Sequence, residues 1–551
     1  KMAADLIFIG GEIITLNDKE PVVEALAIKA NMIVAAGRED DVLQLRNATT
    51  KLVDLKGQAL MPGFIAAHTH PFLTTSLRYF TDISPRTHST SQQVFATMRE
   101  SVGRLDPAKS EWAVFYGYDE CLVQDLPALD AGFIDINVSA TVPVLIISVD
   151  VDNAWFNRRA LAEAGVAVGN VPSLGPGREF VVDKDGQPTG HLRNPAMYYI
   201  MQTARLSLTD EAKKDLYREH FREYARSGFT TVVDLGSNDK DTIKLGLEVA
   251  HEDGCPVRLA RYVVPLLADA NVAPSMPDPS RDRVWIAGVK FWADGDAQSG
   301  TMALNEEYLD TDFVKRLGFP PHHRGRLTYT SDVLREMMEP FHRNGWQIST
   351  HANGDRCVSQ VLDTYRALLA ELPRPDHRYR MEHVGLITHE QLGTAAEMGV
   401  TPSFLVDLIY YYGKSLCEDL IGPERGKRLA PLSSAQSFGH KFSIHEDSPL
   451  FPLTHEPFRS IATAVSRKTK LEDGGKVLGS EYRISAEHAL KACTINAAWQ
   501  IFCERSLGTL EVGKVADMVV LSHNPLTVPC ECIELIKVQA TYMNGQEFRF
   551  V

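Results

Sequence analysis

The chain has 551 residues, a formal net charge of −14 and 44% hydrophobic residues. This length suits a large barrel with a satellite domain. The acidic balance argues against binding to nucleic acid, whose backbone requires a basic patch. No apolar run reaches about 18 residues, so we expect no membrane-spanning helix and no membrane partner. Eight cysteines without a Cys-x-x-Cys pair, and no signal-like leader, predict free thiols in a cytoplasmic protein.

Both ends of the chain predict short strands with no helical pattern between them. Near the N-terminus, residues 4–16, 25–37 and 51–60 have strand composition and are separated by glycine and asparagine. Residues 515–522 and 536–542 follow the same pattern, and Asn544-Gly545 is typical of a hairpin turn. We predict one small β-sandwich domain formed by residues 1–60 together with 500–551.

After the first strand candidate, a long interval precedes the second one. It contains strand candidates of its own, at 112–119 and 142–150. We predict that residues 80–225 form an inserted capping subdomain that closes the mouth of a barrel. A passive insertion that only covers the barrel is the alternative.

The middle of the chain alternates short apolar strands with longer helical patterns, for example at 332–343 and 358–372. This alternation is typical of βα units and a parallel sheet. Eight such units predict an α/β fold, a (β/α)8 TIM-like barrel over residues 61–499. An open doubly wound sheet is the alternative, but no glycine-rich dinucleotide fingerprint supports it. The eight strand candidates are 59–70, 230–236, 257–263, 285–294, 346–352, 380–384, 400–405 and 441–447.

The first barrel strand candidate ends in His68 and His70. Residues i and i+2 of a strand point to the same face, so both imidazoles could reach one metal ion. Such a pair also arises by chance in a chain with 18 histidines. Two hydrogen-bonded structural histidines at a strand terminus are therefore the alternative.

Polar residues also end four later strand candidates, namely Lys290, His351, His383 and Asp447. Each one has an ordinary explanation, such as a structural histidine, a buried ion pair for the lysine or a helix cap for the aspartate. Their shared position favours a common site, because catalytic groups of such barrels lie at the C-terminal ends of the strands.

Metal-assisted hydrolysis would use these residue types. Neutral imidazoles suit zinc and related divalent metals. A lysine that reacts with carbon dioxide becomes a carbamate with two oxygens, which could bridge two ions. A metal lowers the pKa of bound water, and a carboxylate such as Asp447 can accept the proton and pass it to the leaving group.

At this point the chain resembles the amidohydrolase superfamily, in the branch of YtcJ-like and N-substituted formamide deformylase-like hydrolases. The resemblance covers nearly the whole chain. Its matching segments are 62–70, 288–290, 350–355, 382–383, 447–449, 496–498 and 507–517.

The resemblance implies a role for each matching position. The implied ligands of the more buried metal are His68, His70 and Asp447. Asp447 would also move the proton. A carboxylated Lys290 would bridge to a second metal held by His351 and His383. The implied cofactor is one or two divalent metal ions, with zinc expected. The implied partner is a small-molecule substrate, and a homodimer is the default oligomer.

The resemblance also suggests substrate contacts. Tyr118 and Asp119 lie in a segment that resembles a loop approaching the substrate. Trp292 and Asp294, just after Lys290, are similar candidates, and packing or capping of the barrel rim is the alternative for both.

Two departures from relatives alter the expected pocket more than the expected metal ligands. Asp152 stands where relatives carry a histidine that contacts the substrate. At the last strand, Glu446-Asp447-Ser448-Pro449 replaces a Ser-Asp-Trp-Pro pattern, which removes an aromatic wall and adds an acidic neighbour.

The sequence therefore predicts a metal-dependent hydrolase of a C–N bond, in a linear amide, N-acyl or N-formyl compound. Hydrolysis of a cyclic amide or an ester, or deamination of a ring, would use a similar centre. A non-catalytic, metal-loaded regulatory protein is less favoured, because all six implied ligand positions are present.

Overall fold

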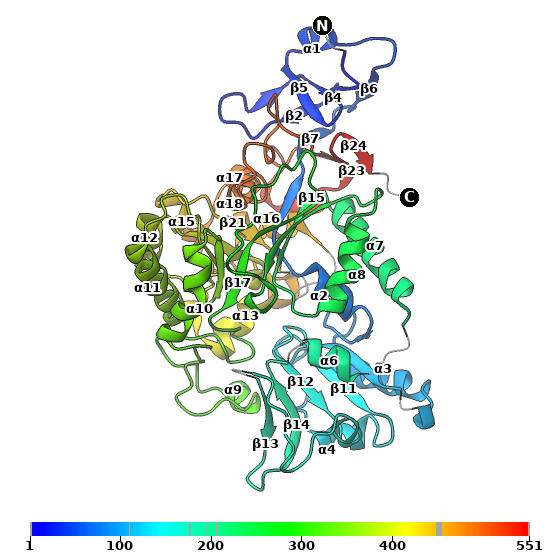
Figure 1. Ribbon diagram of the computed structural model, residues 1–551, viewed down its shortest axis with the longest axis vertical. Helices are drawn as coiled ribbons and strands as arrows, with labels where there is room; N and C mark the ends of the chain where they lie inside the picture. The colour runs from blue at the N-terminus through cyan, green and yellow to red at the C-terminus, as the bar shows by residue number, and fades with distance from the viewer. Residues whose placement is uncertain are drawn as a thin grey trace.

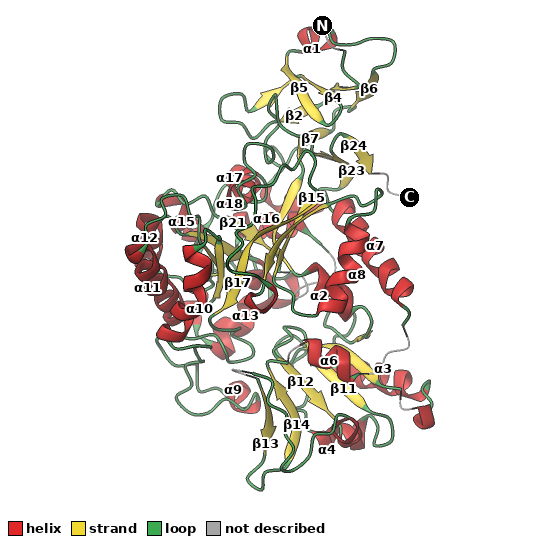
Figure 2. Cartoon of the chain, in the orientation of Figure 1, coloured by secondary structure: helices red, strands yellow, loops and turns green. Residues whose placement is uncertain are grey.

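The computed structural model describes residues 3–109, 111–175, 178–195, 197–204, 208–447 and 455–548. Three parts follow one another along the long axis of the molecule (Figure 1). The sheets formed by the two chain ends lie at one end, the barrel lies in the middle, and an inserted sheet lies at the other end. Figure 2 shows the helices surrounding the strands of the middle part.

Eight parallel strands form the barrel. Their neighbours in the sheet follow the chain order throughout, and the last strand, β21, lies against the first, β8, so that the sheet closes on itself. This confirms the predicted (β/α)8 barrel. The strands are β8 (Phe64–Thr69), β15 (Phe229–Leu235), β16 (Arg258–Val263), β17 (Val284–Trp292), β18 (Ile348–Ala352), β19 (Arg380–His383), β20 (Thr401–Leu405) and β21 (Ser443–His445).

Helices cover the outside of the barrel (Figure 1). Among the described residues, no helix is both long and apolar enough to cross a bilayer. The barrel helices include α2 (Pro71–Leu77), α7 (Asp210–Arg226), α8 (Lys240–Ala250), α10 (Ser331–Arg343), α11 (Asp355–Glu371), α12 (His389–Met398), α13 (Asp407–Ser415), α15 (Leu432–Ser437), α16 (Pro457–Ser466), α17 (Ala486–Ala492) and α18 (Ile495–Gln500).

The first strand candidate, 59–70, is two strands rather than one. Its first half, β7 (Ala59–Pro62), pairs with β2 (Glu12–Ile14) and β22 (Met518–Leu521) in a sheet of the chain ends. Its second half is β8 of the barrel. Gly63 lies between them, where an added Cβ would come within 2.7 Å of the Thr230 hydroxyl. The two strands read as one apolar run because both are buried on each side.

The chain ends form two sheets, of which the six-stranded one combines strands from both ends. A four-stranded sheet has the order β5-β4-β1-β6, and a six-stranded sheet has the order β24-β23-β22-β7-β2-β3. Phe8, Leu26, Met518 and Tyr542 contribute to the buried core of this part. The other strands are β1 (Leu6–Ile9), β3 (Val22–Val23), β4 (Ala25–Lys29), β5 (Met32–Gly37), β6 (Lys51–Asp54), β23 (Val538–Met543) and β24 (Gln546–Phe548).

The inserted sheet has the order β13-β14-β12-β11-β10-β9. Its strands are β9 (Thr81–Asp82), β10 (Ala113–Tyr118), β11 (Val144–Ser148), β12 (Asn153–Phe156), β13 (Glu179–Val182) and β14 (Pro188–Arg193). The predicted insertion, 80–225, extends further than this sheet. Helix α7 packs against α2, α8 and β15, so it belongs to the barrel wall. Its helical period resembles that of any other barrel helix, and only these contacts assign it.

Candidate metal centre and its cavity

His68 lies fully buried at the end of β8, and a carboxylate holds its ring. Its Nδ1 is 2.7 Å from Oε2 of Glu382. Glu382 in turn accepts hydrogen bonds from Arg380 and from the Ser349 hydroxyl, each at 2.7 Å. A carboxylate on one nitrogen fixes the orientation of an imidazole and leaves the other nitrogen for a ligand. Nε2 of His68 is buried and has no hydrogen-bond partner among the described residues.

Glu382 and His383 are consecutive, yet both side chains face His68. Successive residues of a regular strand point to opposite faces. His383 departs from that rule because its φ is 71°, in the left-handed region, and β19 ends there. The ring centroids of His383 and His68 are 4.6 Å apart. A non-glycine residue in this region stores backbone strain of about 1–3 kcal/mol, which the surrounding contacts must offset.

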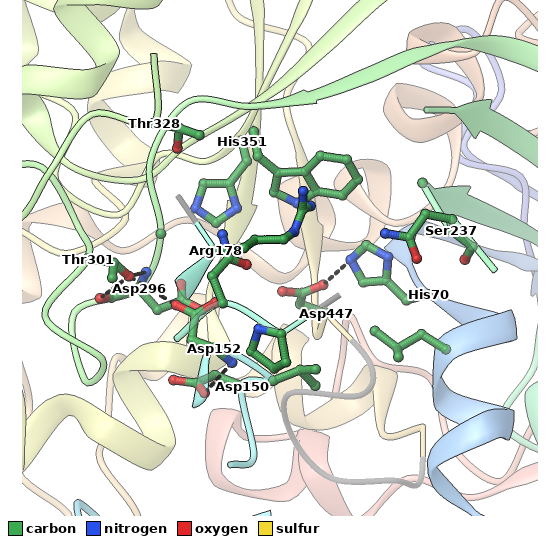
Figure 3. A pocket seen from close by; sticks show the side chains of 18 of the residues that line it. His70, Asp150, Asp152, Arg178, Ser237, Asp296, Thr301, Thr328, His351 and Asp447 are labelled. Atoms are coloured by element: carbon green, nitrogen blue, oxygen red, sulfur yellow. Dashed lines mark hydrogen bonds and ion pairs between the residues drawn. The ribbon is translucent and has the colours of Figure 1, made fainter. Parts of the chain in front are cut away.

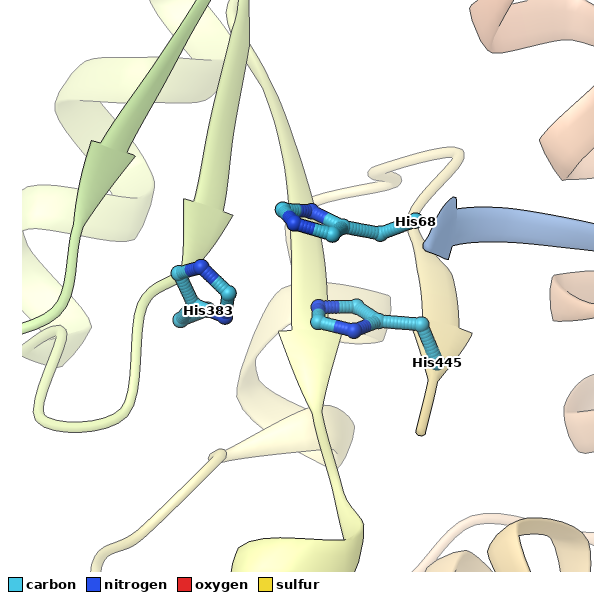
Figure 4. A group of neighbouring side chains, drawn as sticks. All are labelled: His68, His383 and His445. Carbon is cyan, nitrogen blue, oxygen red and sulfur yellow. The ribbon is translucent and has the colours of Figure 1, made fainter. Parts of the chain in front are cut away.

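His445 completes a group of three buried histidines (Figure 4). It stacks on His68 with ring centroids 4.5 Å apart and an interplanar angle of 13°. Neither of its ring nitrogens has a hydrogen-bond partner among the described residues. Sequence reasoning missed His445. Its i, i+2 spacing from Asp447, the same spacing as in the pair His68 and His70, was the available signal.

Asp447 lies among three of the predicted ligands. Its Oδ1 is 3.4 Å from Nε2 of His68 and 3.4 Å from Nε2 of His70, and its Oδ2 is 3.7 Å from Nδ1 of His383. Burial alone would raise the pKa of Asp447, but the close contact with His70 and nearby positive charge bring it below the ordinary value. Its backbone is also left-handed, with a φ of 50°.

His351 and Lys290 extend this group along β18 and β17. The His351 ring centroid is 4.3 Å from that of His383. Lys290 is fully buried, and its Nζ has no hydrogen-bond partner among the described residues. The nearest aromatic contact is with the Trp292 ring, whose centroid is 5.3 Å from Nζ. Burial lowers the pKa of Lys290 to about 8, so a substantial fraction of the amine is neutral near physiological pH.

The donor atoms of this group suit a divalent metal. Buried atoms without hydrogen-bond partners among the described residues include Nε2 of His68 and of His351, Nδ1 of His70 and of His383, Nζ of Lys290 and Oδ1 of Asp447. Burial lowers the pKa of His351 to about 3 and that of His445 to about 4, so these imidazoles are neutral at pH 7. Neutral imidazoles and carboxylates are the ligand types that zinc and similar metals prefer. An unpaired set of this kind costs free energy when nothing occupies it.

The centre opens into a cavity of about 230 Å³. His70, His351, His383 and Asp447 line it, whereas His68 and Lys290 lie behind this surface. Figure 3 shows His70 and Asp447 facing each other across an ion contact, with His351 nearby. The barrel contributes the histidines, and the inserted subdomain contributes Asp150, Asp152 and Arg178. The cavity lining therefore combines the candidate metal centre of the barrel with side chains that only the inserted subdomain provides.

Three of the five residues predicted to contact substrate line this cavity, namely Asp152, Trp292 and Asp294. Asp294 also performs a structural task at the rim. It accepts backbone hydrogen bonds from Ala303, Asn353 and Gly354 at 2.9–3.0 Å, and its Oδ1 is 3.4 Å from Nε2 of His351. The capping alternative therefore describes Asp294 well.

The other two, Tyr118 and Asp119, do not line this cavity. Tyr118 is buried and donates its hydroxyl to the carbonyl of Pro127 at 2.5 Å. Asp119 accepts the Tyr412 hydroxyl at 2.6 Å, which ties the inserted sheet to α13. We therefore do not assign them to substrate contact. The predicted loss of an aromatic wall at Ser448 lies outside the described residues.

Sequence comparison now places the chain among known proteins. Residues 51–548 match the family described as "Amidohydrolase family". The chain belongs to the amidohydrolase family. The motifs at the strand ends had predicted this family, and the match confirms it.

Three relatives of this amidohydrolase cover nearly its whole length. Protein LONG AFTER FAR-RED 3 of Arabidopsis thaliana is 26% identical over 99% of the chain and 92% of its own length. YtcJ of Bacillus subtilis is 24% identical over 98% of both chains. The N-substituted formamide deformylase of Arthrobacter pascens is 21% identical over 98% of the chain and 97% of its own length. The last two confirm the predicted branch of the family.

Solved structures confirm the fold of this amidohydrolase. The crystal structure of an uncharacterized metal-dependent hydrolase from Pyrococcus furiosus superposes with a TM-score of 0.68 at 23% identity. The match covers 95% of this chain and 100% of the other. At this identity the likeness establishes the fold, and the chemistry rests on the residues described above.

Proposed function

We propose that this amidohydrolase hydrolyses the C–N bond of a linear amide or of an N-acyl compound, including an N-formyl compound, with the help of a bound divalent metal. The observation that carries the proposal is the convergence of buried, unpartnered donor atoms with Asp447 at one cavity. The name of the deformylase relative adds support for the substrate class.

The donor atoms of these residues indicate which of them would bind each metal ion. His68, His70 and Asp447 would hold one ion, because one oxygen or nitrogen of each lies within 4.8 Å of the others. His351 and His383 would hold a second ion, with Lys290 between the two. We propose zinc, which imidazole and carboxylate ligands suit. When bound, the metal polarises the substrate carbonyl and lowers the pKa of a water molecule.

Lys290, if carboxylated, would offer two carbamate oxygens as further ligands for the metal. Its neutral amine attacks carbon dioxide, an N–C bond forms, and one amine proton is released to solvent. The product is a carbamate, which carries a negative charge where the reacting amine carried none. Burial favours the reactive form, because it lowers the pKa of Lys290 to about 8.

Asp447 would move the proton during hydrolysis. Its carboxylate lies between the imidazoles and the open cavity, so it can accept a proton from the attacking water. The same carboxyl group can then deliver that proton to the departing amine. Proton transfer by a positioned side chain contributes about 10²–10⁴-fold to a rate.

The test combines metal analysis with a substrate screen on one purified sample. We expect bound divalent metal and hydrolysis of linear amides or N-acyl amines in preference to esters, cyclic amides and ring amines. Full activity in a preparation without divalent metal would refute the metal role. If the enzyme prefers ring amines as substrates, its reaction is deamination and the proposed hydrolysis of linear amides is wrong.

The Asp447→Asn variant tests the proton transfer. We expect kcat to fall about 10²–10⁴-fold, because the amide cannot accept the proton. Circular dichroism and metal content of the variant provide the fold and ligand controls. A variant that keeps its metal and its full kcat would show that another group moves the proton.

A further inference from the structure

One part of the barrel wall lacks the helix that its neighbours have. The connection from β16 to β17, residues 264–283, contains only a 3-10 turn at Pro265–Leu267. Every other connection between consecutive barrel strands contains at least one α-helix. Figure 1 shows β17 between α10 on one side and α8 on the other. In a (β/α)8 barrel each strand is followed by a helix of the outer ring, so the outer face of β16 and β17 is without its usual cover.

A groove of about 620 Å³ lies at this face. Ile243 and Leu247 of α8 line it together with Val263 of β16, Leu267 of the 3-10 turn and Ile286 of β17. The residues that α8 contributes recur at the spacing of a single helical face. The groove is therefore an apolar trough between a helix and two barrel strands.

Large apolar side chains at this face are exposed. Leu266, in the 3-10 turn, is 83% exposed. Ile286 is 40% exposed although it belongs to a barrel strand. Burial of apolar surface is favourable, and an exposed apolar patch with a polar rim marks an interaction site.

The same face offers both a recess and a protrusion. Leu266 directly precedes Leu267, which lines the groove. In a two-fold interface both subunits use the same patch, so a residue at the rim of one copy meets the groove of the other. Leu266 of each copy can then enter the apolar groove of its partner. A second copy of the chain thus brings its own matching apolar group.

The charges along α8 match a second copy as well. Lys240 and Lys244 lie on the groove face in the first half of the helix, and neither forms an ion pair within 4.0 Å with another described residue. Glu248 lies on that face in the second half, and its side chain is 43% exposed while it pairs with Lys214 at 2.6 Å. An antiparallel α8 of a second copy brings Lys244 of each subunit beside Glu248 of the other. Opposite charges that meet in this way fix the orientation of two partners.

We propose that a second copy of this chain covers this groove, with the two α8 helices antiparallel across a two-fold axis. Leu266 of each subunit fills the groove of the other, and Lys244 and Glu248 pair across the interface. The groove shares no lining residue with the cavity of the candidate metal centre. The proposed dimer is therefore independent of the proposed hydrolysis.

Light scattering on the full chain over a range of micromolar concentrations tests the interface. We expect a dimer, and we expect Leu266→Glu and Ile286→Glu each to raise its dissociation constant about tenfold or more, because each places a carboxylate in an apolar contact. Circular dichroism checks the fold, and the high exposure of Leu266 makes its variant the safer one. Val182→Glu is the matched control, since Val182 is 46% exposed on β13 of the inserted sheet. A monomeric wild type, or a dimer that both groove variants retain, would overturn the proposal.

Charge reversal tests the antiparallel arrangement. Lys244→Glu and Glu248→Lys should each weaken the dimer, because like charges then meet across the axis. An equimolar mixture of the two variants should dimerise again, since every position 244 then faces a position 248 of opposite charge. Sedimentation velocity with a fluorescent label on one variant follows the mixed dimer. Effects confined to one chain, such as loss of the pair with Lys214, are not repaired by mixing. A mixture that stays as weak as its components would overturn the arrangement.

Discussion

At the scale of single residues, Glu382 shows how the centre depends on a side chain that does not reach the cavity. It holds Nδ1 of His68 at 2.7 Å and is itself held by Arg380 and Ser349. The positive charge of Arg380 keeps the pKa of Glu382 below its ordinary value even though burial alone would raise it. The carboxylate therefore stays ionised and fixes the tautomer of His68.

The Glu382→Gln variant should weaken metal binding. We expect about a 10–100-fold loss of affinity, the range typical when a partner of a metal ligand is replaced. Competition with a chromophoric chelator measures it. Glu504→Gln is the control, because Glu504 also pairs with an arginine, Arg378, but lies at the other end of β19. Unchanged affinity in Glu382→Gln would show that the ring needs no carboxylate to stay oriented.

The lowered pKa of Lys290 leads to a prediction about how the rate of its carboxylation depends on pH. Only the neutral amine reacts with carbon dioxide, and burial lowers the pKa of Lys290 to about 8. Below that pH, the neutral fraction falls about tenfold per unit. At constant dissolved carbon dioxide, the rate of carboxylation of the metal-free protein should rise with pH up to about 8 and then level off. Carbon-13 NMR with labelled carbon dioxide follows the carbamate, and Lys290→Arg is the control. A rate that does not change between pH 6 and 8 would contradict the assignment.

At the scale of elements, the ends of β19 and β21 shape the centre in different ways. At β19, the left-handed conformation of His383 brings two consecutive side chains to one face. Just after β21, which ends at His445, the left-handed backbone of Asp447 places its carboxylate near His68, whereas Glu446 points to the other side. There Glu446 accepts a hydrogen bond from the backbone N–H of Glu456 at 2.9 Å, and its Oε1 is 2.6 Å from Nδ1 of His455.

The acidic residue that departs from relatives thus has a structural partner. His455 also contacts His220 of α7, with 3.0 Å between their Nε2 atoms, and stacks on Tyr224 at 3.7 Å between centroids. This buried chain joins the end of β21 to a barrel helix and to the start of α16. Glu446 therefore supports the position of Asp447 from behind.

Glu446→Gln should destabilise the protein. A buried hydrogen bond to a charged group contributes about 1.5–3 kcal/mol, so we expect the free energy of unfolding to fall by about that amount. Urea denaturation measures it. Glu534→Gln is the control, since Glu534 is a partly exposed partner of Arg459 and such surface pairs contribute about 0–1 kcal/mol. Equal effects of the two variants would show that Glu446 is not an anchor.

At the scale of the whole molecule, buried titratable groups act on stability in opposite directions. Burial lowers the pKa of His445 to about 4, so between pH 4 and 6.5 the unfolded chain binds more protons than the folded one at this position. Stability from this group is complete above pH 6.5 and is lost as the pH falls. Burial raises the pKa of Asp294 to about 7, which has the opposite sign. The pH dependence of the free energy of unfolding is therefore the sum of opposing contributions. Comparing the wild type with a variant of one residue isolates the contribution of that residue.

The His445→Gln variant isolates that contribution. Between pH 4 and 6.5, the free energy of unfolding of the metal-free wild type should rise with pH more steeply than that of the variant. The difference should be about 1.4 kcal/mol per pH unit, the value for one proton. Chemical denaturation at several pH values in the presence of a chelator measures both slopes. Parallel slopes would show that His445 is protonated in the folded state.

The sequence by itself determined the order of the barrel strands and the predicted ligands at their ends. Apolar runs of strand length alternate with helical periods, and polar residues such as Lys290 and His351 stand out where a buried strand ends. Parallel strands in a barrel bring those ends to one face whatever the details of packing, so these predictions depended on local patterns and on one rule of topology.

Only the tertiary structure decided which side chains meet. His383 joins Glu382 on one face because of a backbone conformation that the residue names do not encode. Asp119 turns to Tyr412, away from the cavity, whereas Asp152 meets Asp150 and Asp296 on its wall. The inserted sheet and the barrel loops are far apart in the chain, and the contacts between them depend on how two folded parts pack. The pattern along the sequence therefore predicted residues that meet at the candidate metal centre, and the packing of the insertion against the barrel brought Asp150 and Asp152 beside Asp296.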